Sequence, residues 1–409
     1  MNSGQFFFGW SFHWPAAAGQ YEDFIKGMWH KVQLFRLEMK KILSWKLLLL
    51  IGIVNALLFQ LRLEFDLDYF PNGRPATDLF LIEQEIIPKY GATLDESEFQ
   101  DLKATYGERV KAADAYFAKQ KQAQELGITD YQTFRNQSNT NPNMSGYHLE
   151  LLYDNVQNLL WELQAWEYLI ENHENEKLSL EANIETTAGA RQQHFKEQQT
   201  GEPPDFYSST VLDNFYTYKT NMAVIILISI ALLMSPVFLR DYRAGLVPIQ
   251  YASKLGRKVY RAKWQAGLCS AALLSAVLLT IYMGLYWTNG TATHFNLPLT
   301  SFGWYDYWYD LTFVQYIFLS VAAIFFVAML LAILSMAVST IVPNAIILIG
   351  IQIVVLFIMI AGVVMYLIRD ILNIWLPQVL VPTGYSVLVL VTIVSAWRIW
   401  KREMHKDIA

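Results

Sequence analysis

The sequence predicts an all-α membrane protein with six transmembrane helices, both termini inside, and an α-helical extracellular domain folded as a coiled hairpin. Apolar residues make up 54% of the chain and charged residues only 16%, against about 25% charged in ordinary globular proteins. The charges are clustered, which leaves long apolar stretches, and a bilayer-spanning helix needs about 20 such residues. These observations exclude an ordinary soluble domain.

The predicted segments follow one another along the chain. In order they are an N-terminal tail (1–20), a cytoplasmic amphipathic interfacial helix (21–41), span 1 (42–61), the extracellular helical domain (62–220), span 2 (221–239), a cytoplasmic loop (240–263), span 3 (264–286), span 4 (312–339), span 5 (345–368), an external segment (369–378), span 6 (379–397) and a cytoplasmic tail (398–409).

The helix before the first span has one apolar face. Its apolar residues recur at steps of three and four and are Ile25, Met28, Trp29, Val32, Phe35, Met39 and Ile42. Charged residues, Glu38 among them, fall between these positions. This pattern is typical of a helix that lies in the membrane plane. A cytosolic helix packed on a partner has the same pattern and remains an alternative.

The orientation follows from the positions of Lys and Arg, which favour the inner side. Residues 1–46 hold six of them, the loop 240–263 holds seven against one acid, and the tail after Trp397 holds four. Segment 62–220 has 13 basic and 27 acidic residues, a net charge of −14, and 287–310 has no Lys or Arg. Six spans with both ends inside agree with this alternation, whereas an odd number does not.

Within the spans, polar residues are few. Pro343 and Asn344 predict a tight turn between spans 4 and 5. Asn55 is the most notable polar residue in the middle of a span, and a hydrogen bond between helices explains it better than transport chemistry. Gly267, Ala271 and Ser275 are small residues at four-residue spacing, which favours close helix packing.

The extracellular domain contains two helical patterns. A capping box at Thr93 and Glu96 begins the first helix, which is expected to end at Gly127. Its apolar repeat is Phe99, Leu102, Tyr106, Val110, Ala113 and Phe117. The second repeat is Leu149, Leu152, Val156, Leu159, Leu163, Trp166 and Ile170. Two apolar repeats with this spacing predict two helices packed as a coiled hairpin. Its acidic surface suits either a cationic ligand or plain solubility.

Several kinds of catalytic and binding chemistry are not indicated. The sequence has no GxxxxGK[ST] phosphate loop, no HExxH and no GxSxG, and its single cysteine, Cys269, excludes a disulfide framework or a cysteine-based metal site. Charges deep within the spans are nearly absent, unlike in ion-coupled carriers. We therefore expect no catalytic residues, no metal and no cofactor on this chain. A protein of this kind that moves a substrate needs an energy source on a partner.

The loop 240–263 carries the most specific pattern. Glycines and a proline interrupt its basic residues. The residues that form the pattern are Asp241, Tyr242, Arg243, Gly245, Pro248, Ser253, Gly256, Arg257, Lys258 and Lys263. Together with the six-span topology, this loop resembles that of the permease subunits of the ABC type-2 exporter family, of the subset with a large extracellular domain between spans one and two. Many relatives have Glu at the position of Asp241.

The resemblance implies a transport mechanism shared between subunits. A separate cytoplasmic ATP-binding subunit would hold ATP and magnesium, and the short helix near 245–252 would couple its closure to the spans. Arg243, Arg257 and Lys258 would face acidic ATPase surface or anionic lipid. A second permease subunit, either a copy or a paralogue, would complete an exporter in the cell membrane, expected to be a bacterial plasma membrane. Nucleic acid is not an expected partner, and the substrate is open among peptides, drug-like or lipidic molecules and cations.

Other classes of protein remain as alternatives. The first is a membrane-anchored receptor or secretion tether whose extracellular hairpin binds a partner. A four-span mechanotransmitting permease is disfavoured by the six spans, and an intramembrane enzyme by the lack of a catalytic constellation.

Overall fold

The computed structural model describes most of the chain. The described residues are 32–137, 142–154, 158–199, 207–252, 256–303 and 306–405. Within these ranges the elements are α-helices with short 3-10 and π-helical stretches, and β-type pairing is limited to isolated bridges. The all-α prediction is therefore confirmed for the described residues. The predicted tail 1–20 and residues 21–31 of the amphipathic helix lie outside them.

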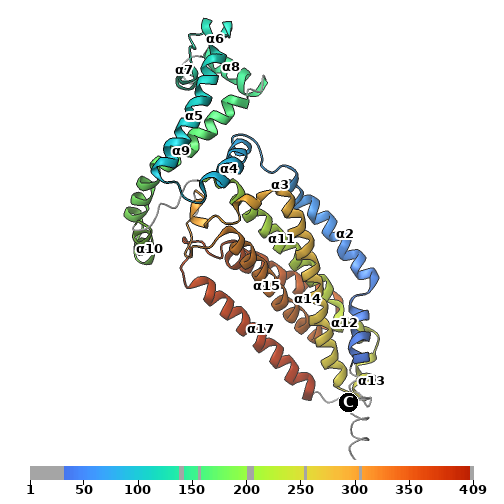
Figure 1. Ribbon diagram of the computed structural model, residues 1–409. Helices are drawn as coiled ribbons and strands as arrows, with labels where there is room; N and C mark the ends of the chain where they lie inside the picture. Colours follow the sequence, from blue (N-terminus) through green and yellow to red (C-terminus); the bar gives the residue numbers. More distant parts are fainter. Residues whose placement is uncertain are drawn as a thin grey trace, which may run out of the picture.

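Six helices among the described residues are long and apolar enough to cross a membrane, which is the number that the sequence predicts. They are α2 (Trp45–Arg62), α11 (Thr210–Met234) continued by α12 (Pro236–Arg243), α14 (Lys258–Tyr286), α15 (Phe313–Ile341), α16 (Ala345–Ile358) continued by the π-helix η5 (Met359–Arg369), and α17 (Leu380–His405). They form one bundle (Figure 1). The chain thus has the architecture of a multi-pass membrane protein.

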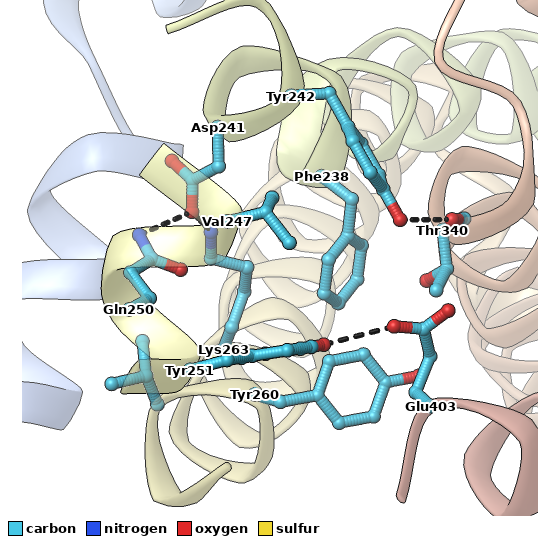
Figure 2. Close-up of a pocket in the computed structure, with 11 residues that line it drawn as sticks. Phe238, Asp241, Tyr242, Val247, Gln250, Tyr251, Tyr260, Lys263, Thr340 and Glu403 are labelled. Atoms are coloured by element: carbon cyan, nitrogen blue, oxygen red, sulfur yellow. Dashed lines mark hydrogen bonds and ion pairs between the residues drawn. The ribbon is translucent and has the colours of Figure 1, made fainter. Parts of the chain in front are cut away.

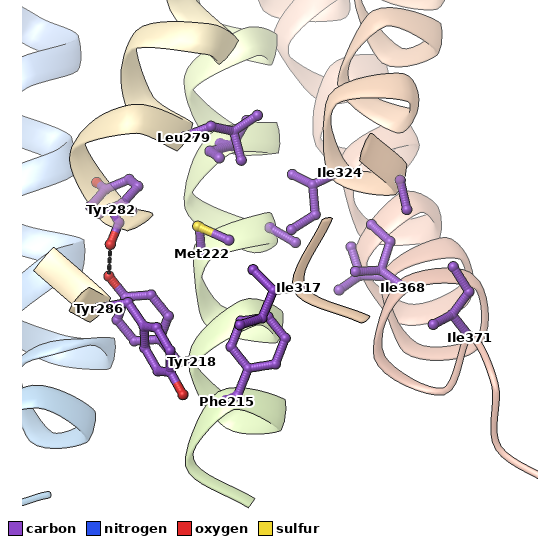
Figure 3. Packing of buried hydrophobic residues seen from close by; sticks show 14 of the residues in the cluster. Phe215, Tyr218, Met222, Leu279, Tyr282, Tyr286, Ile317, Ile324, Ile368 and Ile371 are labelled. Carbon is purple, nitrogen blue, oxygen red and sulfur yellow. Dashed lines mark hydrogen bonds between the residues drawn. The ribbon is translucent and has the colours of Figure 1, made fainter. Parts of the chain in front are cut away.

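Helix α11 lies at the centre of this bundle. It is buried along most of its length and packs against α2, α14, α15 and η5. Figure 3 shows this packing, in which residues of α11 meet those of α14, α15, η5 and the turn after η5: Phe215, Tyr218, Met222, Leu279, Tyr282, Tyr286, Ile317, Ile324, Ile368 and Ile371. The outer helices α2, α16 and α17 are mostly exposed, as expected of helices that face lipid.

Small residues on α14 permit this close packing. A Cβ atom at Gly267 would collide with Met336 Sδ on α15, and Ala271 and Ser275 are fully buried. The four-residue spacing of these residues correctly predicts a close helix contact.

Helix α11 begins earlier than hydropathy predicts. It starts at Thr210 rather than near 221, because Phe215 and Tyr218 continue its buried face among polar neighbours. Two other helices also extend into segments predicted as a loop and a tail: α14 starts at Lys258, and α17 continues to His405. The predicted spans 2, 3 and 6 are therefore the apolar parts of longer helices.

The turn between α15 and α16 is built as the sequence predicts. Helix α15 ends at Ile341, and the side chain of Asn344 accepts hydrogen bonds from the backbone N–H groups of Ile346 and Ile347 at 2.9 and 3.3 Å. These contacts satisfy amides that have no partner within the helix.

The segment between α2 and α11 is a set of helices: α3 (Glu64–Asp68), α4 (Ala76–Tyr90), α5 (Glu96–Phe117), α6 (Lys121–Glu125), α7 (Tyr131–Gln137), α8 (Pro142–Leu149), the π-helix η1 (Glu150–Asp154), α9 (Asn158–Thr186) and α10 (Ala190–Gln199). Helices α5 to α9 stand at one end of the molecule, and we call them the distal domain (Figure 1). They contain a hydrophobic core of their own, centred on Phe117, Phe134 and Leu163.

The distal domain is organised around an antiparallel hairpin of α5 and α9. Tyr106 Oη donates a 2.9 Å hydrogen bond to Glu167, while Lys103 pairs with Glu174. Residues later in α5 thus contact residues earlier in α9, as in antiparallel helices. The two apolar repeats correctly predict this pairing.

Three details of the predicted hairpin are wrong, and Val156 lies outside the described residues. The N-cap is Asp95, not Thr93, and it forms a capping box with Glu98, since the sequence there contains two overlapping cap patterns. The first helix ends at Phe117, because the chain turns into α6 before Gly127. Leu149 is 56% exposed, because α8 and η1 break the continuous helix that the repeat implied.

Candidate functional site

One end of the bundle gathers most of the loop residues that the sequence singled out. There the helix at 32–42, α12, the short helix α13 (Leu246–Ala252), the start of α14 and the end of α17 lie together. We call this region the basic end. It is far from the distal domain in Figure 1. Among the described residues no group of three or more side chains is placed to hold a metal ion.

Two glycines bracket α13. Gly245, before the helix, has φ of +62°, and Gly256, after it, has φ of +44°. This left-handed conformation is costly for residues with a Cβ. Pro248 lies in the first turn of α13, where the missing N–H needs no helical partner. The glycines and the proline therefore define where this helix begins and where the chain turns after it.

The inner side of α13 is joined to the bundle by polar contacts (Figure 2). Gln250 Nε2 donates to Asp241 Oδ2 of α12 at 3.0 Å. Tyr251 Oη donates to Glu403 Oε2 of α17 at 2.9 Å. These contacts join α13 to two different helices, α12 and α17.

The outer side of α13 is exposed and partly apolar. Ile249 is 67% exposed and Leu246 is 37% exposed, and Pro248 is exposed with them. Helix α13 therefore has one side tied to the bundle and one exposed side on which Ile249 is the most accessible apolar residue.

Helix α12 carries a second connection. Tyr242 Oη donates a 2.8 Å hydrogen bond to the backbone carbonyl of Thr340, in the last turn of α15. Through Asp241 and Tyr242, α12 thus links α13 to α15. The space left among the side chains in Figure 2 is only about 20 Å³, room for about one water molecule. The cluster is a packed joint between helices rather than a small-molecule pocket.

Buried charges hold the base of this joint. Lys263 of α14 forms an ion pair with Asp241 and lies 3.6 Å from Glu38 Oε2, and these side chains are 4%, 9% and 3% exposed. Lys41 Nζ contacts Glu38 at 2.6 Å. The side chain of Asp241, although shorter than that of a glutamate, therefore reaches a basic partner. Removing one member of such a buried pair leaves an uncompensated charge.

The amphipathic helix before α2 is only partly as predicted. Residues 32–42 are helical, and Phe35, Met39 and Ile42 pack against the core. Val32 is 58% exposed, which is compatible with an apolar face turned to lipid. Glu38 is buried rather than on a polar surface, because it meets Lys263 of α14.

The predicted site residues fall into two groups. Asp241, Tyr242 and Lys263 face the joint. The others lie around it: Arg243, Gly245, Pro248 and Lys258 are exposed, and Gly256 and Arg257 are partly buried. Ser253 lies outside the described residues.

Asn55 makes contacts between helices, as predicted. Its Nδ2 donates to Ser229 Oγ at 2.8 Å, and its Oδ1 accepts from Tyr282 Oη at 2.7 Å. It therefore joins α2 to α11 and α14 in the middle of the bundle.

Sequence reasoning missed Lys219. This fully buried side chain of α11 donates to Tyr316 Oη and, at 3.1 Å, to the carbonyl of Ile368. The sequence places Lys219 in the predicted extracellular segment 62–220, whereas in the structure it lies within α11. The signal was the continuation of the α11 apolar pattern toward Phe215, which places Lys219 inside the helix.

Comparisons with protein-family models, with curated proteins and with solved structures find no match to this chain. The function proposed below rests on the residues of the chain itself.

Proposed function

We propose that the chain is the permease subunit of an ATP-binding cassette exporter and that α13 docks on a separate ATPase subunit. The observation that carries this proposal is the two-sided arrangement of α13. Gln250 and Tyr251 tie its inner side to Asp241 and Glu403, while Ile249 is exposed on its outer side. A partner that moves α13 thereby acts on several spanning helices together.

The charge around α13 supports the same reading. Arg243 and Lys258 are exposed on either side of it, and basic side chains favour an acidic partner surface by electrostatic steering. The apolar side chains of Leu246 and Ile249 supply the area that such an interface buries. The chain itself has no phosphate-binding loop of the GxxxxGK[ST] type, so ATP hydrolysis would take place on the partner.

Co-purification tests this proposal. The full chain, isolated from its native membrane in mild detergent, is expected to retain an ATPase subunit identifiable by mass spectrometry through its phosphate-binding loop. Ile249→Glu places a charge in the proposed interface and is expected to release that subunit. Leu149→Glu is the matched control, because Leu149 is a similarly exposed apolar residue in the distal domain. Retention of the ATPase by the Ile249 variant would contradict the proposal.

A second candidate function, a receptor or secretion tether, is favoured by the distal domain. This domain has its own core and exposes Leu149 and Tyr153. The same preparations separate the two functions. Loss of a non-ATPase partner from Leu149→Glu, with no ATPase in any preparation, would favour the tether.

A further inference from the structure

A pocket beside the ion pairs of the basic end combines basic and apolar walls. It has a volume of about 140 Å³ and lies between the helix at 32–42, α11, α12 and α14. A single water molecule needs about 10–15 Å³ by the same measure. The pocket therefore accommodates a group of several heavy atoms.

The polar wall carries more positive than negative charge. Lys41, Arg240 and Lys263 line the pocket together with Glu38 and Asp241. Lys263 is paired with Asp241 and lies near Glu38. Lys41 also contacts Glu38, at 2.6 Å, but its side chain is 51% exposed, so it remains accessible to an anion. Arg240 is exposed, and its Nη1 donates to the backbone carbonyl of Lys41 at 2.6 Å. A guanidinium has five N–H donors, so Arg240 retains donors for an anion.

The apolar wall and the surroundings place this pocket at a membrane surface. Ile42, Leu233 and Val237 form the wall, and α2 begins at Trp45, which is 69% exposed and lies beneath the ammonium group of Lys46. Exposed Trp and Lys side chains at the end of a spanning helix typically lie at headgroup level. A headgroup bound between Lys41 and Arg240 would have its acyl chains beside apolar helix surface.

We propose that this pocket binds the headgroup of an anionic phospholipid, with its phosphate held by Lys41 and Arg240. The bound lipid joins the helix at 32–42 to α12 and so strengthens the basic end. The proposal goes beyond the ATPase partnership and does not depend on it, because the outer side of α13 takes no part in the pocket.

Lipid titration of the purified full chain tests this. Binding of dioleoyl phosphatidylglycerol is measured by native mass spectrometry and by the shift in unfolding temperature, with dioleoyl phosphatidylcholine as the uncharged reference. The double variant Lys41→Gln with Arg240→Gln is expected to bind phosphatidylglycerol roughly 30-fold more weakly. This equals about 2 kcal/mol.

The matched control is Arg398→Gln with Lys401→Gln. It removes the same charge from exposed residues of α17 and is expected to bind phosphatidylglycerol as the wild type does. Three results would overturn the proposal: equal weakening in both double variants, no preference of the wild type for phosphatidylglycerol, or the same thermal shift with inorganic phosphate alone, which would identify a soluble anion as the ligand.

A second measurement covers the case in which the Lys41/Arg240 variant does not fold. Wild-type protein is labelled with photoactivatable phosphatidylglycerol and digested. Labelled peptides from 32–42 and 236–243 support the site, and labelling confined to other peptides contradicts it.

Discussion

Lys263 of α14 and Asp241 of α12 form a buried ion pair at the end of the bundle that carries α13. Because Gln250 of α13 donates to the same Asp241 oxygen that meets Lys263, this pair connects the proposed docking helix to the start of α14. Glu38 approaches the same ammonium group, so that one lysine serves two carboxylates.

This shared lysine predicts unequal effects of substitution. Lys263→Met leaves both carboxylates without their common partner and is expected to destabilise the protein by roughly 3–5 kcal/mol. Asp241→Asn is expected to cost clearly less, because Lys263 keeps Glu38. Thermal unfolding in detergent measures both, with the exposed Lys258→Met as a control expected to change stability by about 0.5 kcal/mol or less. Equal losses for the Lys263 and Asp241 variants would show that Glu38 is not a partner.

The contacts of Asn55 predict a modest effect on stability. Tyr282→Phe removes one hydrogen bond between helices and is expected to cost about 0.6 kcal/mol, and Asn55→Leu, which removes two, up to about 1.7 kcal/mol. Thr280→Val is the control, since Thr280 is exposed and bonds only within its own helix. If Asn55 instead served transport, its replacement would abolish activity while leaving the unfolding temperature unchanged.

Burial predicts a pH dependence at Asp66, which lies between α2 and α4. Desolvation raises the pKa of Asp66 from its usual 3.8 to about 6. Because the folded chain holds this proton more tightly than the unfolded chain, the contribution of Asp66 to stability is full below pH 4 and is lost as the pH rises through about 6. Asp66→Asn is expected to remove this component, so that the stability of the variant relative to the wild type rises between pH 4 and about 6 and is constant above that. The difference between their unfolding temperatures from pH 4 to 8 measures it, and a constant difference would contradict the burial of this carboxyl.

Backbone conformation at Gly245 predicts a coupling defect. Its φ of +62° is closed to proline, whose ring holds φ near −65°, whereas asparagine tolerates the left-handed region. Gly245→Pro is expected to abolish most permease-dependent ATP hydrolysis while membrane insertion stays intact, and Gly245→Asn to retain it. The charge reversal Arg257→Glu is expected to lower it as well. Unchanged hydrolysis in both the proline and the charge-reversal variants would count against a coupling role for this loop.

The number and order of the spanning helices were predictable because lipid requires long apolar segments, which hydropathy detects directly. The glycines and proline around α13 were also informative, because backbone freedom is a local property. Lys219 was missed because the first turns of α11 contain many polar and aromatic residues, so hydropathy does not detect them as part of a span. These turns are buried by neighbouring helices rather than exposed to lipid.

The ion cluster was not predictable for a different reason. Glu38 and Lys263 lie far apart in the chain, and each has ordinary charged neighbours in the sequence. Only the packing of the helix at 32–42 against α12 and α14 brings them together. The cap at Asp95 was ambiguous because Thr93 and Asp95 are each followed three residues later by a glutamate.

Photo-crosslinking at position 249 in the native membrane tests the central proposal most directly. A photoreactive residue is introduced in place of Ile249, and the crosslinked products are identified by mass spectrometry, with position 149 in the distal domain as the matched site. We predict an ATPase subunit crosslinked at position 249 and not at position 149. Crosslinks from position 249 that contain only lipid or a protein without an ATP-binding fold would contradict the proposed docking of α13.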